Sequence, residues 1–228
     1  MNIYTTDQRI ESKFITNNFG VNKFLCLIRN NGFLRTYPNR VVNSLYYDNI
    51  QFSSIKDNLT GITPRTKFRL RWYGDSNIGS NNYQFEKKIK LNLTGYKKIL
   101  KFPKKMNLFS IDYSIAGLQK IAKIYDQKIF PLNYKPQLLC RYERQYFENS
   151  YSARLTIDSN IKFCEVKNDI KNDLLKPFLN INCNIVEIKF TPQQKDFLLP
   201  IFRKLPNPST RCSKYLIGHS KINRISYI

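Results

Sequence analysis

Four basic residues at every second position carry the clearest chemistry in this sequence. In the segment PRTKFRLRWY, Arg65, Lys67, Arg69 and Arg71 alternate with one threonine and three apolar residues. Residues two apart in an extended strand share one face, so this spacing places four cations in a row. Such a row is stable when it is hydrated or faces an anion, and the planar guanidinium of Arg binds phosphate oxygens in pairs. The segment therefore predicts a strand that binds a phosphate-rich anion.

Four further segments place acidic and basic residues together on one strand face. They contain Arg9, Glu11 and Lys13; Glu86, Lys88 and Lys90; Arg154, Thr156 and Asp158; and Glu187 and Lys189. A half-solvated sheet with its polar residues outward explains any one of these strands. Five strands of the same kind favour a closed barrel, whose polar interior holds a ligand while helices cover its apolar outer face. The acids inside would offset part of the repulsion and could hold a divalent cation.

The elements that must position these residues are eight strands and three helices. The strand patterns cover Arg9–Phe14, Val41–Tyr47, Pro64–Tyr73, Tyr83–Leu91, Tyr96–Phe102, Gln137–Phe147, Ala153–Phe163 and Ile185–Phe190. Helical patterns cover Asn17–Arg29, Ile111–Asp126 and Pro192–Arg203. Many strands with a few helices between them predict an α+β chain built on an antiparallel sheet. The sequence contains no Gly/Ser linker and no long repeat, which predicts one domain over residues 1–228.

The charge balance limits the class of partner. The formal net charge is +22, from 38 Lys and Arg residues against 16 Asp and Glu residues. Partners of such a chain are polyanions, which include nucleic acids, anionic membranes and phosphate-rich small molecules. Hydrophobic residues make up 42% of the chain and aromatic residues 14%, so its composition is not that of a disordered tail.

Several features predict a cytoplasmic protein. No apolar run approaches the about 18–20 residues needed to span a bilayer, and the N-terminus has no signal-peptide pattern. Five cysteines without a CxxC pair are typical of free thiols in a reducing compartment.

The single histidine narrows the chemistry. Ser-His-Asp or Cys-His catalysis would have to use His219, which we expect to be a surface residue. The sequence also contains neither the P-loop motif nor the dinucleotide-binding glycine motif. Nucleophilic catalysis of those kinds and the two common nucleotide sites are therefore unsupported.

An ordered set of short motifs resembles a known family. The motifs are R-x-E-x-K at Arg9–Lys13, SLYYD at Ser44–Asp48, RTKFRLRWY at Arg65–Tyr73, FEKK at Phe85–Lys88, YER at Tyr142–Arg144, RLTID at Arg154–Asp158, VEIKF at Val186–Phe190 and SKY at Ser213–Tyr215. The set covers nearly the whole chain. It resembles the VTC domain, the polyphosphate polymerase domain of the triphosphate tunnel metalloenzyme (CYTH-like) superfamily.

The resemblance implies a fold, an activity and a site. The fold would be a closed antiparallel eight-stranded β-barrel, and the activity would be transfer of the γ-phosphate of ATP to a growing polyphosphate chain, with Mn²⁺ or Mg²⁺. The catalytic cations would be Arg69, Arg71, Lys88 and Lys214, and the metal ligand Glu187. Together with the alternation of the strands, the resemblance gives a phosphate-binding set of Arg9, Lys13, Arg65, Lys67, Lys90, Lys97, Arg154, Lys189, Arg211 and Ser213. Arg211 stands where the family has lysine, and Lys97 is favoured over Lys98 and Lys101 by alternation.

The residue types suit phosphoryl transfer, which depends on positioning and charge neutralisation more than on covalent chemistry. The attacking group would be the already ionised terminal phosphate of the polymer, so no strong general base is required. Two alternatives remain. One is a metal-dependent triphosphate hydrolase on the same tunnel, although the predicted site is mostly basic. The other is a non-catalytic module that binds polyanions or nucleic acids, and it is disfavoured because most aromatic residues alternate away from the cations.

Overall fold

One antiparallel sheet forms the body of the protein in the computed structural model, which describes residues 3–7, 9–74, 83–92, 94–102, 111–124, 126, 129–167, 170–173, 176–204 and 208–226. Its strands are β1 (Ile3–Asp7), β2 (Ile10–Thr16), β3 (Leu34–Asp48), β4 (Arg65–Tyr73), β5 (Gln84–Leu91), β6 (Thr94–Lys101), β7 (Lys135–Glu148), β8 (Arg154–Glu165), β9 (Leu179–Asn180) and β10 (Asn184–Phe190). The spatial order is β1-β6-β5-β4-β3-β7-β8-β10-β2, with β9 paired to β8. All eight predicted strands are present, with shifted ends.

The helices are α1 (Asn18–Arg29), α2 (Ser53–Thr60), α3 (Ile115–Ala122), α4 (Ile170–Asp173), α5 (Lys195–Arg203) and α6 (Lys214–Asn223). A short 3₁₀ turn, Pro192–Gln194, leads into α5. The three predicted helices correspond to α1, α3 and α5, whereas α2, α4 and α6 were not among the predicted helices. None of the helices in the described ranges is long and apolar enough to cross a membrane.

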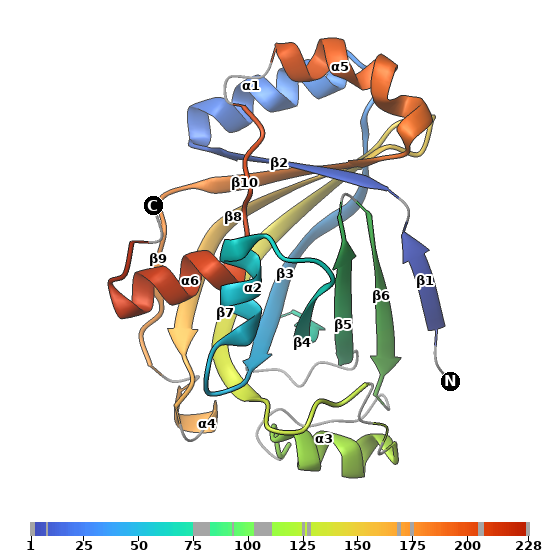
Figure 1. Ribbon diagram of the computed structural model, residues 1–228. Coiled ribbons are helices and arrows are strands. Elements are labelled where there is room, and N and C mark those ends of the chain that lie inside the picture. The colour runs from blue at the N-terminus through green and yellow to red at the C-terminus, as the bar shows by residue number, and fades with distance from the viewer. Residues whose placement is uncertain are drawn as a thin grey trace.

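The predicted closed eight-stranded barrel is wrong in one respect, because hydrogen bonds do not close the sheet. The two edge strands are consecutive in the chain: β1 pairs with β6, and β2 pairs with β10. No ladder among the described residues joins β1 to β2. The N-terminal segment therefore supplies both edge strands of the sheet. The sheet nevertheless curves strongly (Figure 1), and the Lys88 ammonium on β5 lies 2.9 Å from the Glu11 carboxylate on β2.

Helices cover the convex, apolar face of the sheet in two places. Helices α1 and α5 lie together across β2 and β10 (Figure 1), over a cluster that includes Phe14, Phe24 and Leu198. Helix α3 lies at the opposite end of the molecule and belongs to a cluster built around Trp72 and Phe85. Apolar residues that alternate with the charged residues of the strands fill both clusters. The expected outer layer of helices is therefore confirmed for α1, α3 and α5.

The concave face carries a third apolar cluster, against which α2 and α6 pack. Phe163 on β8 and Tyr215 on α6 are both almost completely buried there. Helix α6 approaches the sheet at Gly218, where a Cβ atom would lie 2.5 Å from the ring of Phe163. The Asp48 carboxylate at the end of β3 accepts hydrogen bonds from the Tyr215 hydroxyl (3.0 Å) and from the backbone N–H of Ser54 in α2 (3.1 Å). These contacts hold the start of α6 at the concave face.

Candidate functional site

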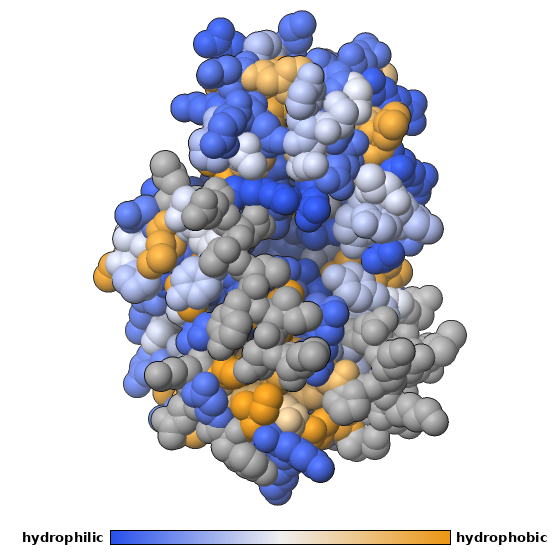
Figure 2. Space-filling view, turned by 90° about the vertical axis from the view of Figure 1, so that its right-hand side faces the viewer, coloured by the Kyte–Doolittle hydropathy of each residue, from blue (hydrophilic) through white to orange (hydrophobic). Residues whose placement is uncertain are grey.

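Charged side chains from seven strands (β2, β4, β5, β6, β7, β8 and β10) and from the start of α6 gather on the concave face. Lys67 on β4 lies opposite Lys88 on β5, which in turn lies opposite Lys97 on β6. On the other wall, Glu187 on β10 lies opposite Lys13 on β2. Figure 2 shows a hollow with hydrophilic walls below the layer of α1 and α5. We call this charged concave region the basic interior.

The two strand arginines of the basic interior share one buried acid. Glu86 is 1% exposed, and its carboxylate lies 2.5 Å from the Arg69 guanidinium and 3.7 Å from that of Arg71. Lys97 approaches the same carboxylate at 4.0 Å. Burial alone would raise the pKa of Glu86, but the neighbouring cations hold it well below the ordinary value. Glu86 is therefore a buried counter-charge for the arginines.

A second buried acid holds Arg144 of β7 and Lys214 of α6. The Asp158 carboxylate, 0% exposed, accepts two hydrogen bonds from Arg144 (2.5 and 2.7 Å) and one from Lys214 (2.5 Å). Both cations also lie over the ring of Tyr142, at 5.2 and 4.7 Å from its centroid. The hydroxyl of Tyr142 accepts a hydrogen bond from Arg71 at 3.1 Å. We refer to Arg144, Asp158 and Lys214 as the Asp158 group.

A third set, which we call the Glu187 group, spans β2, β5 and β10. It consists of Glu11, Lys13, Lys88, Glu187 and Lys189. Glu11 lies 2.6 Å from Lys13 and 2.9 Å from Lys88, and Glu187 lies 3.2 Å from Lys189 and 3.9 Å from Lys13. Cations lower the pKa of both carboxylates against the opposing effect of burial, that of Glu11 to about 2. Both acids are therefore ionised at neutral pH.

The ammonium groups of Lys67 and Lys88 have lowered pKa values. Burial and the positive charges around it lower the pKa of Lys67 to about 7, and the pKa of Lys88 falls to about 8, mainly through burial. The Lys67 ammonium donates hydrogen bonds to Asn58 of α2 (2.9 Å) and to the Ser213 hydroxyl (2.8 Å). A bound anion would favour the charged form of both lysines.

The predicted site residues are not all in one place. Most of them contribute to the three clusters above, and Arg65 and Lys90 lie at the end of β4 and β5 next to Lys67. Arg154 lies at a rim, where its half-exposed guanidinium is 3.5 Å from Glu148. Arg211 is exposed and contacts the turn at Gly61, and Arg9 is half-buried just before β2. His219, expected on the surface, is half-buried against Phe52, with ring centroids 4.6 Å apart.

Five residues of the basic interior were not among the predicted site residues. They are Glu11, Glu86, Tyr142, Arg144 and Asp158. The sequence contains an indication of each residue. The three acids share a strand face with predicted cations, and the YER motif places Tyr142 and Arg144 on one face. The sequence alone does not show which strands pair, and it is the pairing of β7 with β8 that brings Arg144 opposite Asp158.

The carboxylates of the Glu187 group fit a hard divalent cation. Mg²⁺ and Mn²⁺ sites of phosphate-handling proteins use one or two carboxylates, with substrate phosphates and water completing the shell. Glu187 and Glu11 are ionised and lie close enough to influence each other's pKa. No cluster of three or more acidic, histidine or cysteine ligands occurs in the described ranges. A metal here would therefore depend on ligand phosphates for part of its coordination.

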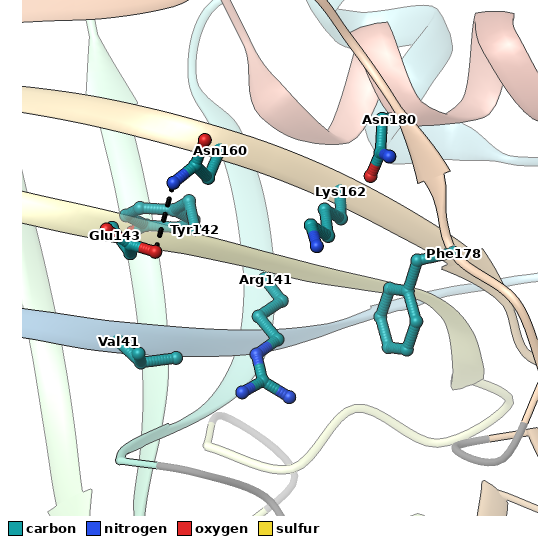
Figure 3. Close-up of a pocket in the computed structure, with 8 residues that line it drawn as sticks. All are labelled: Val41, Arg141, Tyr142, Glu143, Asn160, Lys162, Phe178 and Asn180. Atoms are coloured by element: carbon teal, nitrogen blue, oxygen red, sulfur yellow. Dashed lines mark hydrogen bonds between the residues drawn. The ribbon is translucent and has the colours of Figure 1, made fainter.

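A separate pocket of about 500 Å³ opens on the outer side of the sheet (Figure 3). Arg141 and Lys162 lie opposite each other across β7 and β8, and Asn160 donates a hydrogen bond to Glu143 at 3.0 Å. Phe178 forms part of the wall. Tyr142 contributes to both places, but no charged residue of the basic interior lines this pocket, so the two sites are distinct.

Comparison with known proteins gives a family and a fold. The model of the VTC domain family matches residues 8–223. No protein with curated annotation matches the chain. Among solved structures, a protein from Pyrococcus horikoshii is 14% identical, with 93% of this chain and 99% of that chain covered and a TM-score of 0.55. A Hippeastrum protein with a dominant triphosphatase activity is 13% identical, with 93% and 96% covered and a TM-score of 0.54. At these identities the two structures show a shared fold alone.

Proposed function

Because the chain belongs to the VTC domain family, we propose that it is a metal-dependent phosphotransferase that transfers the γ-phosphate of ATP to inorganic polyphosphate. The phosphates of both substrates would bind in the basic interior. Activity on triphosphates is also what the name of the Hippeastrum structure reports for that protein.

The observation that carries this proposal is the excess of cations in the basic interior. Four acids, Glu11, Glu86, Asp158 and Glu187, share the region with nine cations: Lys13, Lys67, Arg69, Arg71, Lys88, Lys97, Arg144, Lys189 and Lys214. With every lysine protonated the excess is five positive charges, and it lies in a partly buried place, where uncompensated charge is costly. A bound triphosphate would remove much of that cost.

The side chains have separate roles in the proposed reaction. Arg69 and Arg71, held by Glu86, would orient the phosphates with fixed guanidinium planes. Lys13 and Lys88 would neutralise the charge that develops on the transferred group. Glu187, with Glu11, would hold Mn²⁺ or Mg²⁺, and the metal supplies Lewis-acid neutralisation of phosphate oxygens when it is bound. The nucleophile is an ionised phosphate, so a site without histidine is sufficient.

Triphosphate hydrolysis is the second candidate, and the carboxylates of the Glu187 group are the observation that favours it. A metal held there could also orient water. The excess of cations instead favours a site that retains a long polyanion after each transfer. A nucleic-acid module has less support, because large aromatic side chains such as Phe68 and Trp72 are buried under the outer helices.

The test is incubation of the protein with ATP and Mn²⁺, followed by gel electrophoresis for polyphosphate and by separate assays of ADP and free phosphate. We expect polymer to accumulate while ADP forms in proportion to the phosphate incorporated. Release of free phosphate without polymer would replace the proposal with hydrolysis. If neither ATP nor inorganic tripolyphosphate is turned over, the phosphotransferase proposal is wrong.

A further inference from the structure

An arginine surrounded by three tyrosines lies at one end of the basic interior. The guanidinium carbon of Arg40 is 5.0 Å from the ring centroid of Tyr37, 5.6 Å from that of Tyr146 and 6.0 Å from that of Tyr73. The rings of Tyr37 and Tyr146 meet edge to face, with centroids 5.6 Å apart. The four residues come from β3, β4 and β7, which are neighbouring strands. We call them the tyrosine rim.

The tyrosine rim faces the same side of the sheet as the phosphate-binding cations. Arg40 lies directly opposite Arg144 in the β3–β7 ladder, so the two share a face. Tyr73 follows Arg71 by two residues, and Tyr146 follows Arg144 by two residues. Two residues of a strand span about 7 Å, so the rings of Tyr73 and Tyr146 begin about 7 Å beyond Arg71 and Arg144. This is roughly the distance that separates the phosphates of a nucleotide from its base.

The tyrosine rim remains partly accessible to water. Tyr37 is 51% exposed, Arg40 is exposed, and Tyr73 and Tyr146 are half-buried. In the described part of the chain, Arg40 forms no ion pair with an acidic side chain. Aromatic rings and a guanidinium plane that remain accessible to water are the groups on which a nucleobase stacks.

The opposite end of the same strands has a different character. Strand β4 runs from Arg65 to Tyr73, and Arg65 lies opposite Lys90 of β5. Both of these end residues are basic, and Lys67 is next on the same face. This end suits a ligand that is phosphate throughout, whereas the tyrosine rim suits one that ends in a planar aromatic group.

We propose that the tyrosine rim is a nucleobase subsite, which binds the purine of a nucleoside triphosphate while the triphosphate lies on Arg71 and Arg144. The inference rests on the proposed function and adds to it the orientation of the two substrates in the basic interior. The nucleotide occupies the end of the basic interior next to Tyr73, and polyphosphate occupies the end next to Arg65.

The test compares ATP with inorganic tripolyphosphate, which has the phosphates but no base. Dissociation constants for both ligands are measured by titration calorimetry for the wild type, Tyr37→Ala and Tyr37→Phe. Because one stacked base contributes about 1–3 kcal/mol, we expect Tyr37→Ala to weaken ATP binding about tenfold. Tripolyphosphate binding should be unchanged in the same variant, and Tyr37→Phe should resemble the wild type with both ligands.

Tyr151→Ala is the matched control, since Tyr151 is also an exposed tyrosine but packs on Phe197 of α5, with ring centroids 5.3 Å apart. It should change neither dissociation constant. Unchanged ATP binding in Tyr37→Ala, or an equal loss for ATP and tripolyphosphate, would overturn the nucleobase subsite and leave the proposed function standing. A wild-type protein that binds neither ligand would overturn both. Melting temperatures of all variants verify that each one is folded.

Discussion

The Asp158 group and the Glu187 group are both ion-pair clusters of the basic interior, but their acids differ in enclosure. Asp158 is completely buried and makes three charged hydrogen bonds of 2.5–2.7 Å. The side chain of Glu187 remains 12% exposed and that of Glu11 15% exposed. Contacts in the Glu187 group range from 2.6 to 3.9 Å, and all of its cations are lysines.

The difference indicates two roles for carboxylates within one charged region. An enclosed acid that accepts three charged hydrogen bonds from an arginine and a lysine has little coordination left to offer, so it fixes the cations in place. An acid that is partly open and pairs with flexible lysines can exchange those partners for a metal or make room for phosphate. We therefore expect loss of Asp158 to affect mainly stability and loss of Glu187 to affect mainly activity.

The largest expected effect is that of Asp158→Asn. The change leaves Arg144 and Lys214 buried without an anion, and removal of one partner from a buried ion pair costs about 3–5 kcal/mol. For a chain of this size, the melting temperature should fall by roughly 10 °C. Thermal unfolding followed by circular dichroism measures the shift.

Glu143→Gln is the control for this measurement. Glu143 accepts a hydrogen bond from the exposed Asn160 on the outer face, and its replacement should alter the free energy of unfolding by less than about 0.5 kcal/mol. Equal melting temperatures for Asp158→Asn and the wild type would remove the distinction between the two groups.

The second prediction concerns Glu187→Gln, which should abolish turnover while the fold is kept. A metal contributes several kcal/mol of charge stabilisation, and its loss is on the order of a thousandfold in rate. Tripolyphosphate should still bind, because one negative charge has left a basic site. ATP turnover at several Mn²⁺ concentrations tests this. If Glu187→Gln keeps wild-type turnover and the same Mn²⁺ dependence, Glu187 is only a counter-charge for Lys13 and Lys189.

Much of this arrangement follows from the period of the strands. Alternation alone placed Arg65, Lys67, Arg69 and Arg71 on one face, and in the structure this face is the concave one. Alternation also favoured Lys97, which indeed lies opposite Lys88. Such patterns are local, since the direction of a side chain in a strand depends only on its position in that strand.

Features that depend on contacts between distant segments were not predictable in the same way. Helix α6 has a weak apolar pattern, and its position depends on the close approach of Gly218 to Phe163, 55 residues earlier in the chain. Arg144 belongs to the site because it pairs with Asp158 of the RLTID motif. From that motif, the sequence analysis predicted Arg154 as the phosphate-binding residue instead. The open edge between β1 and β2 likewise depends on distant pairing, because β1 pairs with β6 whereas β2 pairs with β10.

The third prediction uses Lys67, the cation with the most strongly lowered pKa near the Glu187 group. Charges facing it come from Lys13, Lys88 and Arg65, which disfavour its protonation, and from Glu11, which favours it. A bound phosphate raises the pKa above its free value of about 7, so affinity is fully present below pH 7 and declines as the pH rises above it. Each unit by which binding raises this pKa is worth about tenfold in affinity.

Calorimetry of tripolyphosphate binding between pH 6.5 and 8.5 measures this effect. Lys67→Gln should bind more weakly at pH 6.5 and lose part of the pH dependence. Comparison of the two proteins with one ligand cancels the ligand's own titration. Identical slopes for Lys67→Gln and the wild type would show that Lys67 does not take up a proton on binding.

The smallest expected effect is that of Arg154→Gln, at a position predicted to bind phosphate. Arg154 lies opposite Lys189 on the concave face, but its side chain is 55% exposed and its ion pair with Glu148 is long. Exposed pairs contribute about 0–1 kcal/mol, so the melting temperature should hardly change. Tripolyphosphate affinity should fall about threefold at low salt and not at all near 1 M salt, where the Debye length is about 3 Å. A loss above tenfold that persists at high salt would mean that Arg154 contacts the phosphates directly. Arg154 would then belong to the phosphate-binding site as fully as Arg144 does.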